Sequence, residues 1–226
     1  MKKKKKGITL CCVASGSGSD FQAIANAWKS GMLPEVEKVV LISTSSSAYC
    51  LERAKKMGIA STVVESIKSD GRSWLPDDEL SAALEALGGV DLMFLVGCIH
   101  EVPCVVPTYN IHPANTRRHG GKTMYGLAVH KHVLAEVIDE ITRGWVKPEQ
   151  AFYTEVTVHD ADAPYDQGEA LVTLRVQIPS NIIERLLRKK LHPKRAAQML
   201  QKQVLIYEHL LLPVAVRAAA QKIMDQ

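Results

Sequence analysis

The sequence predicts an α/β protein built on a doubly wound, mostly parallel sheet with helices on both faces. Three observations lead to this fold class. Short apolar runs alternate with helical patterns through the first half of the chain, as is typical of parallel strands joined by crossover helices. The run DLMFLV at residues 91–96 is apolar throughout, as expected for a central strand that is covered on both faces. Near the C-terminal end, two segments alternate apolar and polar residues around a polar turn, which indicates an antiparallel strand pair before the last helices.

The first half of the chain contains four strand patterns and three helical patterns. Residues 8–14 form an apolar run, and apolar residues then recur at helical spacing from Phe21 to Trp28. Asp20 precedes that helix and is a favourable N-cap, and Gly58 is a favourable C-terminal cap for the next one. We therefore expect strands at residues 8–14, 38–43, 61–64 and 91–96, and helices at residues 21–29, 48–57 and 77–87.

The second half has a different pattern. A short strand ends at Pro113, and the chain closes with helical periodicity rather than further βα units. No internal repeat and no linker-like segment divides the chain, so we expect one domain over residues 8–226. The expected elements are strands at residues 109–112, 152–158 and 170–178, and helices at residues 127–143, 181–189 and 194–223.

The charge of the chain is concentrated in its first residues. The formal net charge is +4 over 226 residues, and Lys2 to Lys6 alone contribute five positive charges. The rest of the chain is close to neutral, so no basic face for nucleic acid is expected. We interpret residues 1–7 as a disordered, solvated tail; nucleic-acid or membrane binding by that tail is the alternative.

Cysteine usage indicates a reducing compartment. The five cysteines are odd in number, show no CxxC spacing, and lie mostly within apolar segments. These features predict reduced thiols in a cytoplasmic protein. The apolar run at residues 8–14 is short for a secretory signal and leads into a Gly/Ser loop. No later run approaches a transmembrane span, and the sequence leaves monomer and homodimer open.

The first candidate site is the loop between the first strand and the first helix. Glycines allow a close backbone approach, and free N–H groups at a helix N-terminus attract an anion. A tight turn without a ligand is the alternative. The loop has neither the lysine of a P-loop nor the third glycine of a dinucleotide fingerprint, whose position Phe21 occupies. The predicted phosphate-binding residues are Gly16, Ser17, Gly18, Ser19 and Asp20.

The second candidate site combines an amide and an imidazole. Asn110 and His112 lie two residues apart on one strand face, at the carboxyl end where open α/β sheets bind ligands. An amide can hold a developing oxyanion while an imidazole moves protons. Asp166, in the later turn, would raise the pKa of His112 if its carboxylate reached the ring. Each of these residues taken alone is more often structural. No His, Cys, Asp or Glu set has metal-site spacing, so no metal is expected.

Taken in order, the motifs resemble the phosphoribosylglycinamide formyltransferase family. The match covers most of the chain, and the NIHP motif with the later DxG is its most specific part. The matching stretches are SGSGSDFQAI, LERAKKMGI, NIHP, GLAVHKHVL, TVHDADAPYDQG and EHLLLP. The resemblance implies a Rossmann-like formyltransferase fold and a one-carbon transferase of purine biosynthesis. Such an enzyme passes the formyl group of 10-formyltetrahydrofolate, its cosubstrate, to glycinamide ribonucleotide.

The resemblance also implies roles for individual residues. Asn110, His112 and Asp166 correspond to the catalytic trio: Asn110 holds the tetrahedral oxygen, and His112, kept charged by Asp166, relays a proton. Glu208 would contact the ribose of the acceptor. The implied folate-binding residues are Ile99, His100, Glu101, Val102, Asp162, Ala163, Pro164 and Tyr165.

The sequence departs from the family pattern at several places. The loop after the His-Pro motif is longer and basic, and His100 replaces an arginine that is common beside the folate. Asp20 stands where asparagine is usual, and its carboxylate would weaken phosphate binding unless it turns inward. We expect Arg117, Arg118 and Lys122 of the long loop to form an anion-binding cluster that compensates for the missing arginine.

Two classes of alternative function remain at this point. The acceptor can be another phosphorylated amine, a sugar nucleotide or methionyl-tRNA, or the chain can be a formyltetrahydrofolate hydrolase. The tRNA enzyme and the hydrolase are expected to carry extra domains that this chain is too short to hold. A non-catalytic folate- or nucleotide-binding module on the same sheet is the second class. The presence of Asn110, His112 and Asp166 together argues against a pure binding module.

Overall fold

The computed structural model describes residues 7–162 and 166–225. The predicted lysine tail at residues 1–6 and the predicted folate-pocket residues Ala163, Pro164 and Tyr165 lie outside the described residues. Gly7, which we expected in the tail, is buried instead. The chain is packed closely there, since a Cβ at this position would lie 2.9 Å from Glu37 Cβ.

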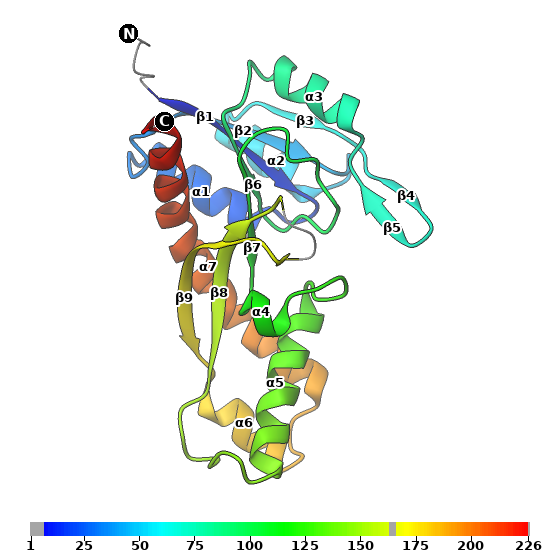
Figure 1. The fold of residues 1–226 in the computed structure, drawn as a ribbon, viewed down its shortest axis with the longest axis vertical. Helices are drawn as coiled ribbons and strands as arrows, with labels where there is room; N and C mark the ends of the chain where they lie inside the picture. Colours follow the sequence, from blue (N-terminus) through cyan, green and yellow to red (C-terminus); the bar gives the residue numbers. More distant parts are fainter. Residues whose placement is uncertain (1–6, 163–165, 226) are drawn as a thin grey trace.

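A seven-stranded mixed sheet forms the centre of the described structure, in the order β3-β2-β1-β6-β7-β8-β9 (Figure 1). The first five strands in this order pair in parallel, and β8 and β9 add to the β7 edge in antiparallel pairs. This arrangement confirms the predicted fold class. The strands are β1 (Ile8–Ala14), β2 (Val36–Ser43), β3 (Ser61–Val63), β6 (Leu92–Leu95), β7 (Thr108–His112), β8 (Tyr153–Asp160) and β9 (Ala170–Gln177).

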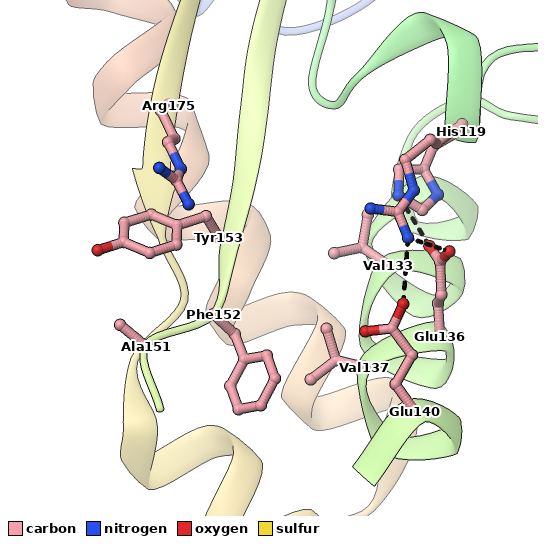
Figure 2. Close-up of a pocket in the computed structure, with 10 residues that line it drawn as sticks. His119, Val133, Glu136, Val137, Glu140, Ala151, Phe152, Tyr153 and Arg175 are labelled. Carbon is pink, nitrogen blue, oxygen red and sulfur yellow. Dashed lines mark hydrogen bonds and ion pairs between the residues drawn. The ribbon is translucent and has the colours of Figure 1, made fainter. Parts of the chain in front are cut away.

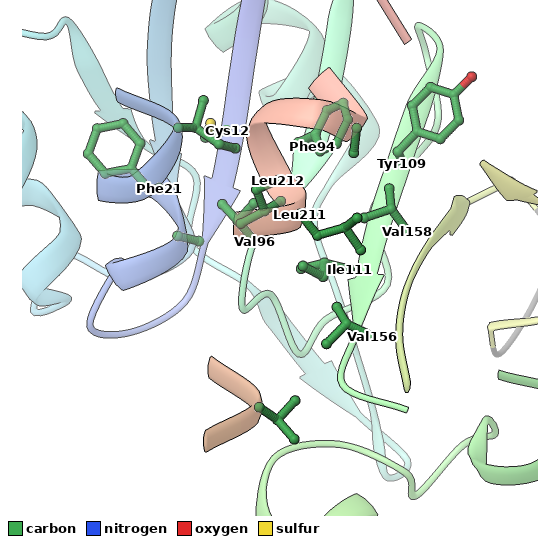
Figure 3. Packing of buried hydrophobic residues seen from close by; sticks show 14 of the residues in the cluster. Cys12, Phe21, Phe94, Val96, Tyr109, Ile111, Val156, Val158, Leu211 and Leu212 are labelled. Carbon is green, nitrogen blue, oxygen red and sulfur yellow. The ribbon is translucent and has the colours of Figure 1, made fainter. Parts of the chain in front are cut away.

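Helices cover both faces of this sheet because successive residues of the central strands point to opposite sides. In β1, Leu10 and Cys12 belong to the larger apolar core, whereas Cys11 and Val13 belong to the smaller one. The larger core includes buried residues of α1 (Ser19–Lys29), α2 (Tyr49–Met57), α5 (Leu127–Thr142), α6 (Ser180–Leu187) and α7 (Pro193–Met224), and the smaller core those of α3 (Asp77–Ala86). Figure 3 shows part of the larger core, where Leu211 and Leu212 of α7 lie near Ile111, Val158 and Phe94.

The helix α7 differs from the expectation that no run approaches a membrane span. By length and composition it is apolar enough to cross a membrane, and 44% of its most apolar window is buried inside the structure. Its long apolar face contacts α1, α5, β8 and β9. This burial explains the apolar composition, because a helix that packs against a sheet and two other helices needs a wide apolar face.

Two short elements were not predicted. The hairpin of β4 (Ile67–Ser69) and β5 (Arg72–Trp74) has strands of three residues each, too short to show a period of two. The helix α4 (Thr116–His119) is a single turn, started by the Asn115 side chain. One predicted cap was wrong: Gly18 is the N-cap of α1, and Asp20 makes no capping hydrogen bond.

Candidate active site

The candidate site lies at the edge where β1, β6 and β7 end. Parallel strands bring their carboxyl ends to the same edge of a sheet, so the loops that follow them meet there. The N–H of Ser15, after β1, donates to the carbonyl of Gly97, after β6, at 3.3 Å. The N–H of Ile99 donates to Ser15 Oγ at 3.4 Å. The phosphate loop and the predicted folate segment are therefore neighbours, which the sequence alone did not show.

In the Gly-rich loop, the backbone of Gly18 has a conformation that favours glycine. Gly18 has φ of +70°, and a Cβ there would lie 2.5 Å from Cys50 Cβ. Helix α2 holds the loop from behind: Cys50 N–H donates to Gly16 O at 3.0 Å and Arg53 Nε donates to Ser17 O at 2.7 Å. The loop carbonyls thus face α2, and the first N–H groups of α1 have no partner within the helix. Such a helix start is suited to binding an anion.

The carboxylate of Asp20 is turned inward, away from solvent. Its side chain is buried in the first turn of α1, and Oδ1 lies 3.2 Å from Nε2 of His209 on α7. Glu208, also on α7, is buried as well. Burial, and next the charge of Asp20, raise the pKa of Glu208 to about 8, so the Glu208 carboxyl is mostly neutral at neutral pH. The inward turn removes part of the expected conflict between Asp20 and a phosphate.

The three predicted catalytic residues come together although Asp166 is far from the other two in sequence. Asn110 Nδ2 donates to Asp166 Oδ1 at 3.2 Å, and His112 Nδ1 lies 3.6 Å from Asp166 Oδ2. The backbone N–H of Gly121 donates to Asp166 Oδ2 at 3.4 Å. Asp166 has φ of +63°, in the left-handed region that aspartate tolerates better than most residues. The turn between β8 and β9 therefore presents its carboxylate to both β7 side chains.

The structure adds His159 to this group. It lies opposite Asn110 in the antiparallel pair of β7 and β8. Its Nδ1 donates to the Asp160 carbonyl at 2.8 Å, and its Nε2 lies 3.3 Å from Asn110 Nδ2 and 3.4 Å from Asp166 Oδ1. The signal for it was the His in the TVHDADAPYDQG stretch, but its role required the strand register. Asn110, His112, His159 and Asp166 are called the acid–base cluster below.

The net direction of the pKa of His112 differs from the expectation. Burial lowers the pKa of His112, and this effect exceeds the opposing effects of Asp166 and of the His119 carbonyl. Asp166 itself raises this pKa, as expected. His112 Nε2 lies 2.9 Å from the His119 carbonyl, which can only accept, so Nε2 carries the hydrogen. The basic nitrogen of the neutral ring is consequently Nδ1, on the side of Asp166.

The Asp166 carboxylate itself stays ionised. Burial would raise the pKa of Asp166, but His159, His112 and the N–H of Gly121 together outweigh burial and lower it. A negative charge is thus fixed 3.6 Å from the basic nitrogen of His112. This geometry stabilises the imidazolium whenever a proton is delivered to Nδ1, so the cluster can accept a proton and return it.

The basic loop only partly matches its prediction. Arg118 Nη2 forms ion pairs with the carboxylates of Glu136 and Glu140 of α5, at 2.5 and 3.2 Å. Its guanidinium is therefore occupied, and the anion-binding hypothesis depends on Arg117, which is exposed, and on Lys122. The hydrogen bond from Arg72, and to a smaller extent the positive charge of Lys122, lower the pKa of Glu101. Lys122 is thus within electrostatic range of the predicted folate segment.

The predicted folate segment packs against the β4–β5 hairpin. Glu101 N–H donates to Ser73 O and Leu75 N–H donates to Glu101 O, each at 2.9 Å, so these backbone groups already have partners. His100 Nδ1 lies 2.7 Å from Ser73 Oγ, and Ile99 is exposed. A cleft of about 460 Å³ lies beside this junction, lined by Arg72, Trp74, Leu75, Asp77, Glu101, Val102 and Pro103.

The two histidines of α5 have different environments. His130 is buried, and burial, with a smaller effect of His112, lowers its pKa to about 4. His132 lies against His119, with ring centroids 5.3 Å apart. Among residues 7–162 and 166–225, no group of three or more His, Cys, Asp or Glu side chains is placed to hold a metal ion.

Several known proteins resemble this chain in sequence. A phosphoribosylglycinamide formyltransferase of Arabidopsis thaliana, described as chloroplastic, is 30% identical over 190 residues, which is 81% of this chain and 60% of that protein. The chain spans 52% of a second plant relative with the same description, from Vigna unguiculata. A phosphoribosylglycinamide formyltransferase of Dictyostelium discoideum is 25% identical over 202 residues, covering 79% of this chain and 88% of that protein.

Solved structures have the same fold. The glycinamide ribonucleotide transformylase 1 of Symbiobacterium toebii superposes with a TM-score of 0.67 at 23% identity, covering 98% of this chain and 92% of that one. The corresponding protein of Geobacillus kaustophilus gives a TM-score of 0.62 at 24% identity, with coverages of 93% and 97%. At these identities the likeness is one of fold. The sequence model of the formyl transferase family matches residues 9–204, and the chain therefore belongs to the formyl transferase family.

Proposed function

We propose that this protein transfers a formyl group from 10-formyltetrahydrofolate to the amine of glycinamide ribonucleotide. The observation that carries the proposal is the position of Asp166, within reach of both Asn110 and His112 at the edge where the Gly-rich loop also ends. A module that only binds ligands needs no ionised carboxylate beside a buried imidazole. The resemblance to phosphoribosylglycinamide formyltransferases supports the choice of acceptor.

The acceptor phosphate would bind at the start of α1. The N–H groups from Gly18 to Asp20 supply donors, and the helix dipole adds partial positive charge there. The neutral Glu208 carboxyl, close to Asp20, would meet the ribose, where it can both donate to and accept from a hydroxyl. Binding of an uncharged sugar by an uncharged carboxyl avoids the desolvation of a carboxylate.

The formyl donor would bind along residues 97–104 and the β4–β5 hairpin. The cleft there has a volume of about 460 Å³, within the usual range for a small-molecule site. Trp74, Leu75 and Val102 offer apolar surface for a ring system. Arg72 lies beside the cleft but pairs with Glu101 at 2.5 Å, so attraction of the carboxylates of a folate tail would depend mainly on Lys122, whose charge also acts on Glu101. The residues present thus fit the cosubstrate, and no metal takes part in the scheme.

The chemistry would follow from the hydrogen positions. The acceptor nitrogen attacks the formyl carbon, and a new C–N bond forms while the carbonyl oxygen gains negative charge. Asn110 Nδ2 has two hydrogens. In the ligand-free protein one is donated to Asp166 and the other points to Nε2 of His159, and this second hydrogen would turn to the developing oxygen. The proton lost by the amine passes to Nδ1 of His112, beside the Asp166 carboxylate. It is then returned to the folate nitrogen as the C–N bond to the donor breaks.

The remaining assignments are also proposals. We infer a single domain over residues 8–226 and a cytoplasmic location, which the free state of all five cysteines supports. Monomer and homodimer are both compatible with the site, because the described residues of one chain supply the whole acid–base cluster.

The test is a formyl-transfer assay on the purified protein. Loss of the formyl group from 10-formyltetrahydrofolate is followed with glycinamide ribonucleotide, with an amino-sugar nucleotide, and with no acceptor. Transfer that requires glycinamide ribonucleotide supports the proposal. Transfer to the sugar nucleotide alone would mean that the acceptor is an amino-sugar nucleotide and not glycinamide ribonucleotide. Release of formate without an acceptor would indicate a hydrolase. No loss of the formyl group in any arm would refute catalysis.

A further inference from the structure

The segment between the His-Pro motif and α5 is built around Asn115. Its side-chain Oδ1 accepts from the N–H groups of Arg117 and Arg118, at 3.0 and 3.1 Å, which starts the single turn of α4. Its Nδ2 donates to Glu155 on β8 at 2.9 Å. The His119 N–H then donates to the Asn115 carbonyl at 2.8 Å. The segment is therefore held in one conformation rather than left as a solvated loop.

This segment contacts two members of the acid–base cluster. The His119 carbonyl accepts the hydrogen of His112 Nε2 at 2.9 Å. Two residues later, Gly121 N–H donates to Asp166. Gly120 lies so close to the cluster that a Cβ there would meet Thr116 O at 2.3 Å and Asp166 Cβ at 3.2 Å. The backbone of residues 119–121 thus sets the surroundings of both the imidazole and its carboxylate.

The His119 side chain connects that backbone to helix α5. The ring is buried, and its Nε2 lies 3.2 Å from Glu136 Oε2 of α5. Its Nδ1 lies 3.0 Å from His132 Nδ1, also on α5. Figure 2 shows a second cavity, of about 190 Å³, with His119 lying beside Glu136 on its α5 side; a dashed contact joins His119 to Glu136, and another runs to Glu140. Helix α5 therefore holds the residue whose carbonyl fixes the tautomer of His112.

We propose that His119 and Glu136 form a clasp that positions His112, with Glu136 as the anchor and the His119 carbonyl as the contact to the imidazole. Neither residue would touch substrate, so both are positioning residues. The proposal rests on the acid–base role of His112 proposed above. Its structural part, the control of the proton affinity and tautomer of His112, can be measured in the ligand-free protein.

The charged and titratable groups around the His112 and His119 rings determine the direction in which the pKa of His112 should change. His112 is faced by Asp166 from the β8–β9 turn, by His159 of β8, and by His130 of α5. The His119 carbonyl raises the pKa of His112, against the larger lowering by burial. Loss of the clasp would remove this acceptor, and the pKa of His112 would fall further below its ordinary value. The His119 ring is itself faced by Glu136, His132, Arg118 and His112.

The experiment compares Glu136→Ala with Asp139→Ala. Both substitutions remove a carboxylate from α5 that pairs with an arginine, but Asp139 pairs with Arg143 on the exposed surface, at 2.8 Å. The imidazole titration of His112 is followed by NMR without ligands, and kcat is measured against pH. In Glu136→Ala we expect the His112 midpoint to fall by about half a pH unit or more. The acidic limb of kcat should move by the same amount, with both KM values within about twofold of wild type.

Two further variants make the outcome decisive. His119→Ala should shift the His112 titration in the same direction, and His119→Gln, which keeps a hydrogen-bonding group, should restore part of it. If His119→Ala fails to fold, Glu136→Ala alone decides the question. A His112 titration in Glu136→Ala that superposes on those of wild type and Asp139→Ala overturns the clasp. A shifted titration in a protein that transfers no formyl group would instead refute the proposed function and leave the clasp standing.

Discussion

Two carboxyl groups of this protein, the partly buried Asp166 and the buried Glu208, have pKa values that are shifted in opposite directions. The Asp166 side chain is 16% exposed and Glu208 is 9% exposed, so burial disfavours the charge of both. Asp166 receives N–H groups and faces two imidazoles, and its pKa is lowered in spite of burial. Glu208 has the Asp20 carboxylate as its charged neighbour, and its pKa is raised to about 8. The comparison teaches that the neighbours, and not burial alone, decide which carboxyl carries a charge.

The difference divides the site into two chemical regions. Around Asp166 a fixed negative charge can support an imidazole that takes up and releases a proton. Around Glu208 a neutral carboxyl lies near the start of α1, where the proposed phosphate would supply the negative charge. One region is suited to proton transfer and the other to recognition of a sugar phosphate.

The largest expected effect comes from Asp166→Asn. The substitution removes the charge beside His112 Nδ1, so proton uptake becomes less favourable and turnover should fall about a hundredfold or more. The acidic limb of the kcat profile should also move to lower pH, because the pKa of His112 falls further. Glu169→Gln, an exposed carboxylate near the same turn, is the matched control. Unchanged turnover in Asp166→Asn would remove the proton-transfer role from this region.

The next effect is on stability and concerns Glu208→Gln. A carboxyl whose pKa is raised in the folded state contributes stability that is complete below its unfolded pKa and is lost progressively until the pH has risen through about 8. The glutamine variant lacks this loss, so we expect its free energy of unfolding at pH 8.5 to exceed that of wild type by on the order of 4 kcal/mol, because each pKa unit corresponds to about 1.4 kcal/mol. Urea unfolding at pH 5 and pH 8.5 measures the difference. Parallel pH dependence of the two proteins would mean that Glu208 is ionised.

A smaller effect is expected from Asp20→Asn. This change removes the negative charge beside Glu208 and near the proposed phosphate site, so the KM of the phosphorylated acceptor should fall several-fold at low salt. That change corresponds to a gain in binding free energy of less than about 1 kcal/mol. The KM of the folate should not change. Inhibition by inorganic phosphate, competitive with the acceptor, should strengthen in parallel. A change in the folate KM alone would mean that the two pockets are assigned the wrong way round.

The smallest effect concerns the basic loop. Arg117→Ala with Lys122→Ala should raise the KM of one anionic substrate several-fold at low salt, and the difference should shrink at high salt as screening increases. Lys189→Ala with Lys190→Ala, on the turn after α6, removes the same number of charges elsewhere. Equal KM values for both double variants and wild type would show that the loop charges take no part in binding.

The sequence predicted the sheet well because its strands carry strong patterns. The apolar run at residues 91–96 predicted a strand without knowledge of the strands that pair with it, and the alternation of apolar and polar residues in β8 and β9 was equally clear. The short hairpin and α4 were missed because three or four residues show no period. Asp20 was assigned as a cap because residue type favours it, yet the left-handed Gly18 begins the helix and leaves Asp20 in its first turn.

For the candidate site, the sequence predicted which residues come together better than it predicted their pKa values. Asn110, His112 and Asp166 are in contact as expected, but the pKa direction of His112 depends on its burial, which no motif reports. His159 joins them only through the pairing of β7 with β8. The carboxylates that pair with Arg118, those of Glu136 and Glu140, lie one turn apart in the second half of α5, a contact that requires the tertiary structure.

The antiparallel pairing of Asn110 with His159 also determines when the chain acquires its chemistry. Synthesis proceeds from the N-terminus, and a domain generally folds as a unit. A ribosome that has reached the end of α5 has already made the Gly-rich loop, five strands of the sheet, and both side chains of β7. The nascent chain still lacks His159, Asp166 and helix α7, which packs against α1. The acid–base cluster is thus complete only after β8 and the turn that follows it have been made.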